Sequence, residues 1–244
     1  MNDSESTIAL LYRRVYEVIC GAHPQLRPWH FQWSAVRYLY RDFKHTLPLL
    51  RGRVLDVGCG GKPYESWLEQ ADDYVGLDIE ESADVHVTAG NPWPLASESF
   101  DVVFSSQVLE HVEDLSQTLS EIDRVLKPGG SVVLSFPFLF NEHDGPADYR
   151  RFTVHWAARL LPATYEIEIL KTQGGIGSTL TIALLNWLDL SSNRYFATRL
   201  LKALLLPLWL VVSLAANLLG MIGDLLDGTD AFYNNILIVA RKKS

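Results

Sequence analysis

The chain has 244 residues, of which 48% are hydrophobic and 20% are charged, enough apolar material for one well-buried domain with an insertion. This composition excludes a largely disordered protein. The net charge of −8, with no basic block longer than the final RKKS, argues against a broad phosphate-binding face. We therefore expect no nucleic-acid partner.

The two cysteines, Cys20 and Cys59, are too few for a disulfide framework, which favours a reducing compartment. The first twenty residues open with acidic side chains, and charges interrupt every apolar run. This order differs from that of a secretory signal. We expect the protein to face the cytoplasm.

Helical spacing of apolar residues over 7–20 and 29–45 predicts an N-terminal helical cap, residues 1–50. From residue 51, short apolar runs alternate with helical segments. This alternation predicts an α/β fold with a Rossmann-like, doubly wound, mostly parallel sheet of seven strands. The expected core covers 51–174 and 231–244, with a helix in KPYESWLEQ, a helix over 115–126 and NNILIVARKK as a closing edge strand.

A hydrophobic helical insertion is expected over 175–230, because residues 203–223 carry no charge. This run is long enough to span a membrane, yet the last strand must return to the same sheet. We therefore predict a shallow hairpin, broken at Pro207 and Asn217, that attaches the protein to the inner face of a membrane. Three basic residues would meet anionic headgroups: Arg194, Arg199 and Lys202. The alternative is a helical subdomain on the protein's own core or in a homo-oligomer.

The segment VLDVGCGGKPY points to a nucleoside ligand. A strand ends at Asp56, glycines follow at 58, 60 and 61, and the next strand ends at Asp78. Glycine lets the backbone approach a ligand closely, and the second acid can accept hydrogen bonds from ribose hydroxyls. This spacing alone does not separate a nicotinamide enzyme from a methyltransferase.

Four motifs in order, VLDVGCGG, VGLDIE, PWPLASESFDVVFSSQVLEHVED and RVLKPGG, resemble the class I S-adenosylmethionine-dependent methyltransferases, in the branch that carries LEHV. The resemblance implies an enzyme with S-adenosylmethionine as its cofactor. It gives His111 two places, lining the inner side of the cofactor or packing against the sheet with a local hydrogen bond, and we favour packing. The implied cofactor contacts are the methionine end at Asp56, Gly58, Cys59 and Gly60, the ribose at Asp78, the adenine between Ile79 and Asn91, and the inner side at Gln107 and Val108.

The spacing H-x-x-P-x-D-x-x-R-x-T over residues 143–153 resembles a subgroup associated with cell-surface polysaccharide and glycolipid assembly. A hydroxyl acceptor needs a base, and histidine suits that task near neutral pH. We expect His143 to be the base, Asp148 to orient it and Arg151 to grip an anionic acceptor. Tyr64 and Tyr149 are candidate pocket walls, and no metal site is expected.

These features predict O-methylation of a sugar or lipid-linked glycan hydroxyl at a membrane surface. A second hypothesis keeps the cofactor and changes the acceptor to a membrane quinone or isoprenoid ring. A third hypothesis is a catalytically silent, membrane-attached protein that binds the cofactor. The intact set of Asp56, Gly58, Gly60 and Asp78 argues against the third.

Overall fold

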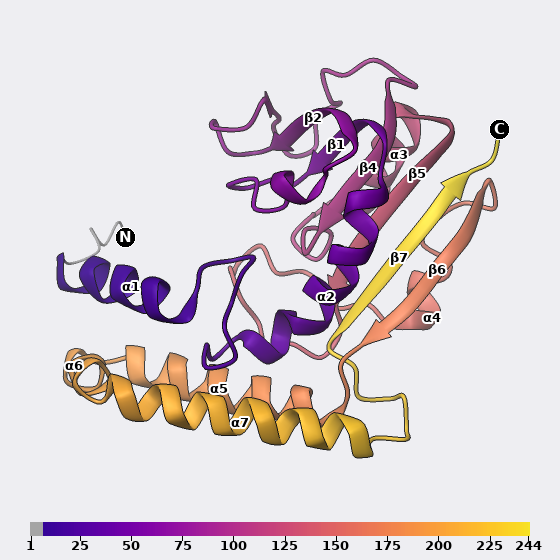
Figure 1. The fold of residues 1–244 in the computed structure, drawn as a ribbon. Helices are drawn as coiled ribbons and strands as arrows, with labels where there is room; N and C mark the ends of the chain where they lie inside the picture. The colour runs from indigo at the N-terminus through magenta and orange to yellow at the C-terminus, as the bar shows by residue number, and fades with distance from the viewer. Residues whose placement is uncertain (1–6) are drawn as a thin grey trace. The chain divides into compact units, whose positions relative to one another are not determined.

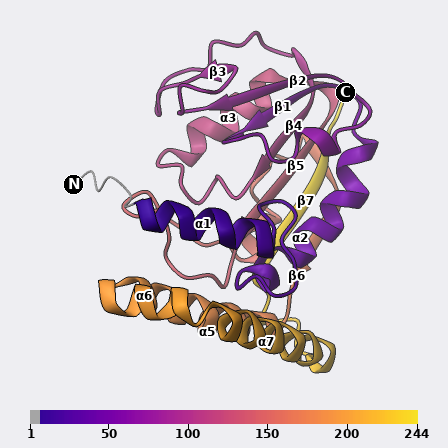
Figure 2. The same cartoon turned by 60° about the vertical axis from the view of Figure 1, so that its left-hand side comes forward.

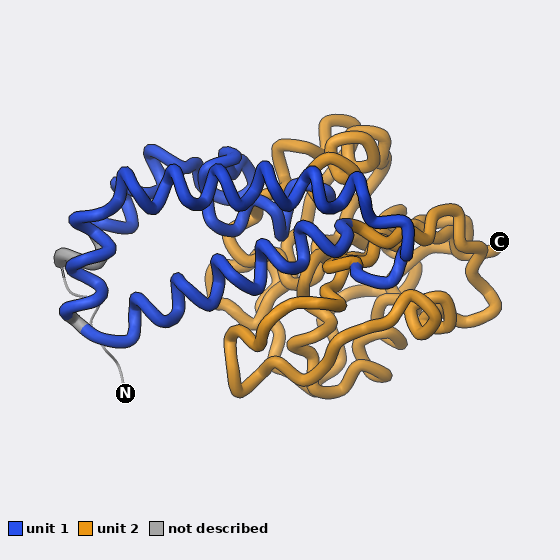
Figure 3. Tube along the Cα trace, turned by 90° about the horizontal axis from the view of Figure 1, so that it is seen from below, with its two compact units in different colours: residues 1–38, 174–232 blue, residues 39–173, 233–244 orange. Residues whose placement is uncertain are grey.

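The structure, a computed structural model, describes residues 7–244, so residues 1–6 of the predicted cap lie outside the described residues. The chain divides into two compact units (Figure 3). The sheet unit combines Leu39–Gln173 with Tyr233–Ser244, and the helical unit combines residues up to Tyr38 with Gly174–Phe232. The predicted cap is thus divided between the units, with the boundary inside a helix.

The sheet unit holds seven strands in the order β3-β2-β1-β4-β5-β7-β6 (Figure 1). Neighbouring strands are parallel except at β7, which is antiparallel to both β5 and β6. This confirms the predicted doubly wound, mostly parallel sheet. The strands are β1 (Gly52–Val57), β2 (Ala71–Asp78), β3 (Val85–His86), β4 (Phe100–Ser106), β5 (Leu126–Pro137), β6 (Tyr165–Gln173) and β7 (Asn235–Lys242).

Helices and turns connect these strands. The helices are α1 (Thr7–Cys20), α2 (Trp33–Thr46), α3 (Leu115–Val125), α4 (Val154–Ala157), α5 (Ile176–Asn193), α6 (Phe196–Leu204) and α7 (Leu206–Leu226). Two short 3-10 turns, η1 (Leu47–Leu49) and η2 (Glu65–Trp67), complete the set. The insertion predicted before the last strand is present as α5, α6 and α7.

Two expectations about the sheet unit are wrong. The segment KPYESWLEQ forms only the turn η2, since Pro63 and the short span before β2 leave little room for a helix. The strand β7 is interior, because it pairs with β5 on one side and β6 on the other (Figures 1 and 2). Its residues Asn235–Ala240 are buried, which an edge strand would not require.

Apolar side chains cover both faces of the sheet. On one face α3 packs Ile122 and Val125 into a core cluster with Leu55, Phe100 and Leu134. The helix begins at its N-cap Asp114, whose carboxylate accepts a hydrogen bond from the Gln117 amide at 3.0 Å. It ends at Val125, so Leu126 opens β5 rather than closing the predicted helix.

The other face carries an aromatic cluster. Phe43 of α2 lies edge-on to Tyr64 and to Phe104, with ring centroids 5.2 and 5.3 Å away. Tyr64 is buried within this cluster and packs as a core aromatic. The α2 helix therefore covers this face of the sheet.

The helical unit has small and polar residues at its centre. The α5 and α7 helices lie side by side (Figure 2), and a Cβ added at Gly177 of α5 would lie 2.1 Å from the Gly220 carbonyl oxygen of α7. Asn217 of α7 is buried, accepts from the Ser34 hydroxyl at 2.6 Å and donates to the carbonyls of Pro28 and His30. Polar contacts and close backbone packing thus hold this unit together.

Two details of the predicted hairpin are wrong. The α7 helix continues through Asn217, because the Asn217 side chain bonds to other segments and does not interrupt the helix. Only Pro207, in the first turn of α7, marks a break. Lys202 is buried in an ion pair with Asp189, so it does not face outward as Arg194 and Arg199 do.

Candidate functional site

The glycine-rich turn after β1 brings its backbone to an open surface. Gly58 has φ of +74°, and a Cβ there would lie 2.3 Å from Val108, so only glycine fits. At Gly60, φ is +46°, and no heavy atom lies within 4 Å of where a Cβ would be. The turn therefore leaves room for a ligand against the backbone at Gly60.

Asp78 ends β2 beside this turn. One carboxylate oxygen accepts from the Gly60 amide at 2.8 Å, and the other accepts from the Glu80 amide at 3.2 Å. A carboxylate keeps further lone pairs for two hydroxyl donors. The next residue, Ile79, is 64% exposed, an apolar surface beside the acid. Asn91 is exposed in the loop after β3, and its amide donates to the Thr88 carbonyl at 3.1 Å.

Asp56 and Cys59 are buried under the turn. Asp56 accepts from the Tyr74 hydroxyl at 2.6 Å. Burial raises the pKa of Asp56 to about 7; the Tyr74 bond lowers it and the nearby Asp78 charge raises it. Burial also raises the pKa of the Cys59 thiol to about 11, with further contributions from the charges of Asp56 and Asp78. The thiol is therefore neutral, and the Asp56 carboxyl changes charge near neutral pH.

The segment after β4 approaches the same edge of the sheet. Gln107 has φ of +57° and donates its amide to the Ser135 carbonyl of β5 at 2.8 Å. Val108 packs against Gly58. Because the carboxyl ends of parallel strands form the ligand crevice in open α/β sheets, residues 107 and 108 lie at the edge where the cofactor residues were predicted.

Two arginines hold the loop after β5 in place. Arg150 donates to the backbone carbonyls of Leu109, Val112 and Glu113, which fixes the segment after β4. Arg151 uses all five of its N–H groups on Asp148 and on the carbonyls of Phe140, Asn141 and Arg150. No Arg151 donor remains for an anionic acceptor in this conformation.

Asp148 connects this loop to His143. Its carboxylate accepts from the His143 amide at 2.9 Å and lies 3.4 Å from Nδ1 of the His143 ring. The hydrogen bond from Arg151 holds the pKa of Asp148 well below its usual range. Asp148 is therefore an anion that fixes both the backbone and the ring of His143.

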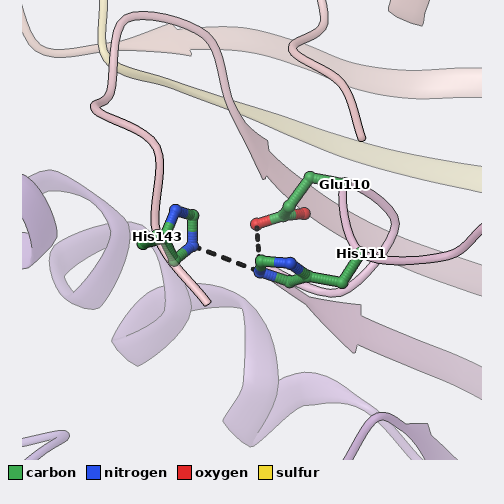
Figure 4. A group of neighbouring side chains, drawn as sticks. All are labelled: Glu110, His111 and His143. Atoms are coloured by element: carbon green, nitrogen blue, oxygen red, sulfur yellow. Dashed lines mark hydrogen bonds and ion pairs between the residues drawn. The ribbon is translucent and has the colours of Figure 1, made fainter. Parts of the chain in front are cut away.

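Two histidines and a glutamate meet between these segments (Figure 4). Nε2 of His111 lies 3.2 Å from Nε2 of His143 and 3.9 Å from a carboxylate oxygen of Glu110. Glu110 is fully buried, and neither of its carboxylate oxygens has a hydrogen-bond partner. Burial raises the pKa of Glu110 to about 8, a rise that its own amide and the Arg151 charge limit.

This cluster was not predicted from the sequence. Packing was favoured for His111 over lining the cofactor, and Nδ1 of His111 does bond locally, to the Ala147 carbonyl at 2.8 Å. The signal that could have revealed the cluster is the pair Glu110-His111 in the segment after β4, together with a third candidate ligand, His143, in the segment after β5. Tyr149 is 48% exposed and donates its amide to the Glu110 carbonyl at 3.0 Å.

Part of the chain is similar in sequence to known proteins. A family model described as a methyltransferase domain matches residues 55–134. A protein of Mycolicibacterium smegmatis named "probable S-adenosylmethionine-dependent methyltransferase" is 38% identical over 34% of this chain and 37% of its own length. A ubiquinone biosynthesis O-methyltransferase of Cereibacter sphaeroides is 35% identical over 39% of this chain and 45% of its own length. The chain thus covers less than half of either relative.

Two solved structures share the fold. An S-adenosylmethionine-dependent methyltransferase from Mesorhizobium loti has a TM-score of 0.51 and 17% identity, over 87% of this chain and all of that one. The [4+2]-cyclase SpnF has a TM-score of 0.52 and 19% identity, over 83% of this chain and 79% of that one. Since one of these structures is titled a cyclase, the fold by itself does not fix the reaction.

The family match and the named relatives identify the domain more closely than the fold does. Residues 55–134 therefore resemble an S-adenosylmethionine-dependent methyltransferase domain. The glycine turn fits that cofactor, because backbone at Gly60 is open, Asp78 offers a carboxylate and Ile79 an apolar face.

Proposed function

We propose that this chain is an S-adenosylmethionine-dependent methyltransferase and that it methylates a hydroxyl of a glycan carried on a membrane lipid. The observation that carries the proposal is the polar cluster at His143, which lies after β5 at the same sheet edge as the glycine turn. When bound, S-adenosylmethionine supplies a methyl group whose carbon–sulfur bond breaks as the carbon–oxygen bond to the acceptor forms. The glycan assignment comes from the H-x-x-P-x-D-x-x-R-x-T spacing of residues 143–153.

Within this proposal the cofactor lies on the glycine turn. Asp78 accepts hydrogen bonds from the ribose hydroxyls, and the exposed side chain of Ile79 packs against the adenine. The backbone at Gly58 and Gly60 approaches the methionine end, where the buried carboxylate of Asp56 attracts its positive charges. Gln107 and Val108 line the inner side.

The acceptor side belongs to the loop after β5. A sugar hydroxyl is a weak acid, so its proton must be removed as the new bond forms. His143 promotes the removal of this proton. Asp148 and Arg151 are positioning residues, because Asp148 contacts the backbone and the ring of His143 and Arg151 holds Asp148. The remaining task of the site is to align the two reactants and exclude water.

The cofactor assignment is tested with Asp78→Ala. Loss of the ribose acceptor should weaken S-adenosylmethionine binding by about 1–3 kcal/mol, measured by calorimetry on folded protein. The exposed Asp72 of the same strand is the matched control. Equal affinity in the Asp78→Ala and Asp72→Ala variants would contradict the ribose contact.

The membrane part of the proposal rests on the helical unit. Among residues 7–244, α7 is the one helix long and apolar enough to cross a membrane, with a mean hydropathy of 1.9. The insertion leaves the sheet at Gln173 and returns at Asn235, and these two residues are register partners in β6 and β7. A chain that returns to its starting strand needs an even number of crossings. We therefore propose that α5 and α7 lie at the inner membrane surface without crossing it.

Vesicle flotation of the full chain tests the attachment. The protein should float with anionic vesicles, and replacing residues 176–229 by a short Gly/Ser bridge should leave it at the bottom. A full-length protein that stays soluble without detergent and does not float contradicts the attachment. Reaction of a tag in the 189–198 loop from outside the cell would show a true crossing instead.

A quinone ring is the second candidate acceptor, because one relative is named as a ubiquinone biosynthesis O-methyltransferase. A phenolic hydroxyl, with a pKa near 10, loses its proton far more readily than a sugar hydroxyl. His143→Ala should therefore lower turnover about a hundredfold or more with a glycolipid and much less with a phenolic quinol. Assays of both acceptors with one variant decide between them.

A further inference from the structure

Three side chains at the ends of β4 and β5 direct possible ligand atoms toward one point. One carboxylate oxygen of Glu110 and one ring nitrogen each of His111 and His143 lie within 4.8 Å of one another (Figure 4). Two imidazole nitrogens held tetrahedrally at zinc–nitrogen distances of 2.0–2.1 Å would be about 3.3 Å apart. The 3.2 Å between the two Nε2 atoms matches that spacing.

The far sides of both imidazole rings are also occupied. Nδ1 of His111 lies 2.8 Å from the Ala147 carbonyl oxygen, and Nδ1 of His143 lies 3.3 Å from the Asn141 carbonyl oxygen and 3.4 Å from Asp148. These oxygens are acceptors, and in the tautomer with hydrogen on Nδ1 each Nε2 presents a lone pair. The Arg151 guanidinium, a donor, also lies beside the His143 ring, with Nη2 3.5 Å from Nδ1. Metal-binding histidines are oriented in this manner by a carbonyl or carboxylate behind the ring.

Glu110 is a second and independent indication. Its side chain is fully buried, and neither oxygen has a hydrogen-bond partner. An unpaired buried polar group costs several kcal/mol. A cation beside the carboxylate removes that cost, and it also separates the two facing lone pairs of the histidines.

We propose that Glu110, His111 and His143 bind one divalent transition-metal ion of the zinc type. Two imidazoles and one carboxylate favour zinc, iron or cobalt over magnesium and calcium, which prefer oxygen ligands. Three protein ligands leave a position for an exchangeable oxygen. Arg150 and Asp148 support the site by fixing the two segments that carry the histidines.

The role of the ion rests on the proposed function. An ion held by these residues would bind the acceptor hydroxyl and lower its pKa, so that the proton would be lost to bulk water as the acceptor binds, before the methyl group is transferred. His143 then acts on the acceptor as a metal ligand, and its Nε2 does not take the proton directly. Binding of the ion itself does not depend on which acceptor the enzyme uses.

Metal binding is tested on the full chain after dialysis against a chelator. Titration with zinc chloride by calorimetry and with cobalt chloride by visible absorption should each show one equivalent bound, confirmed by elemental mass spectrometry. His143→Ala, His111→Ala and Glu110→Gln should each weaken zinc binding about a hundredfold or more. His155→Ala and Glu113→Gln, which change exposed side chains, should match the unchanged protein.

The variants are compared at equal S-adenosylmethionine affinity, which shows that the fold is kept. Zinc affinity that is the same in His143→Ala, Glu110→Gln and the two control variants overturns the site. Methyl transfer at an undiminished rate in metal-free protein overturns the role of the ion, while the proposed function stands. If zinc binding depends on Glu110, His111 and His143 but the unchanged protein does not bind S-adenosylmethionine, the metal site is supported and the proposed function is contradicted.

Discussion

The sheet unit and the helical unit place their apolar side chains in opposite ways. In the sheet unit the large apolar side chains, such as Phe43, Phe104 and Phe136, are fully buried. In the helical unit large apolar side chains are exposed, with Leu225 84% and Leu226 81% accessible. The centre of that unit instead contains Ser213 and Asn217, both fully buried. The two units therefore suit different surroundings.

This contrast follows from how each unit is stabilised. Burial of apolar area stabilises the sheet unit in water. The helical unit depends on close approach of backbones at Gly177 and Gly220 and on side-chain hydrogen bonds such as that of Asn217. Small residues and polar contacts are the means by which helices associate in lipid, where apolar burial gives little advantage. The contrast supports the proposed membrane attachment.

The largest difference between the two units is expected when an aromatic ring is removed from the sheet unit. Phe104→Ala should lower the free energy of unfolding by about 3–5 kcal/mol, because it leaves a cavity between Phe43 and Tyr64. Leu225→Ala, at an exposed position of α7, should change it by less than about 0.5 kcal/mol. Denaturant unfolding measures both. Similar losses from the two variants would mean that Leu225 is buried in the folded protein.

A smaller effect is expected where the helical unit packs backbone on backbone. Gly177→Ala would place a methyl group against the Gly220 carbonyl oxygen, and it should destabilise the unit by about 1–3 kcal/mol. Gly228→Ala is the matched control, since no heavy atom lies within 4 Å of its added Cβ. If both variants melt at the same temperature, the close contact between α5 and α7 is not required.

The third test concerns a buried polar group of the sheet unit, the carboxyl of Asp56, which we propose serves ligand binding. Burial holds the pKa of Asp56 near 7, above its unfolded value of about 3.9. The folded state therefore binds more protons in this window, and the contribution of Asp56 to stability falls as pH rises from about 4 to 7. The ionised form attracts the cationic cofactor, so cofactor affinity should rise up to about tenfold between pH 6 and 7.5.

Asp56→Asn removes this titration. Its S-adenosylmethionine affinity, measured by calorimetry, should be low and nearly constant over the same pH range. Asp72→Asn, which changes an exposed acid, should keep the rise seen in the unchanged protein. A rise that persists in Asp56→Asn would assign the titration to another group.

The smallest effect is expected from single surface charges. Arg194→Ala should weaken binding to anionic vesicles by about 1 kcal/mol, or roughly fivefold, with the loss reduced at high salt. Arg241→Ala, on the exposed end of β7 in the sheet unit, should leave vesicle affinity unchanged. Equal losses from both variants would point to general charge attraction and not to a surface of the helical unit.

The positions of β1 and β2 in the sequence were predictable because the signals for them are local. Strand β1 ends at Val57, one residue after Asp56, and β2 ends at Asp78, and the glycine turn follows a short apolar run, so composition and spacing were sufficient. The interior place of β7 was not predictable in this way. Its apolar run is equally compatible with an edge or a centre, and pairing on both sides is a property of the tertiary structure.

The candidate site was predictable one residue at a time but not as a set. His143 was expected to be catalytic from its place after the fifth strand, whereas His111 was expected to pack against the sheet and Glu110 was not considered. These residues are 32 or more positions away from His143 in the chain. Arg150 and Arg151 bring the segments together through backbone carbonyls, and a sequence pattern does not show such contacts.

The interior place of β7 also imposes an order on folding. Within residues 7–244, β6 pairs with β7 alone, and the two strands are separated in the chain by the three helices of the insertion. During synthesis, residues 165–173 therefore emerge well before their pairing partner. The insertion has to be made and accommodated before the sheet can close, so any delay in placing α5, α6 and α7 prolongs the exposure of an unpaired strand edge. The late pairing of β7 makes this stage the one at which the nascent chain is most vulnerable to aggregation.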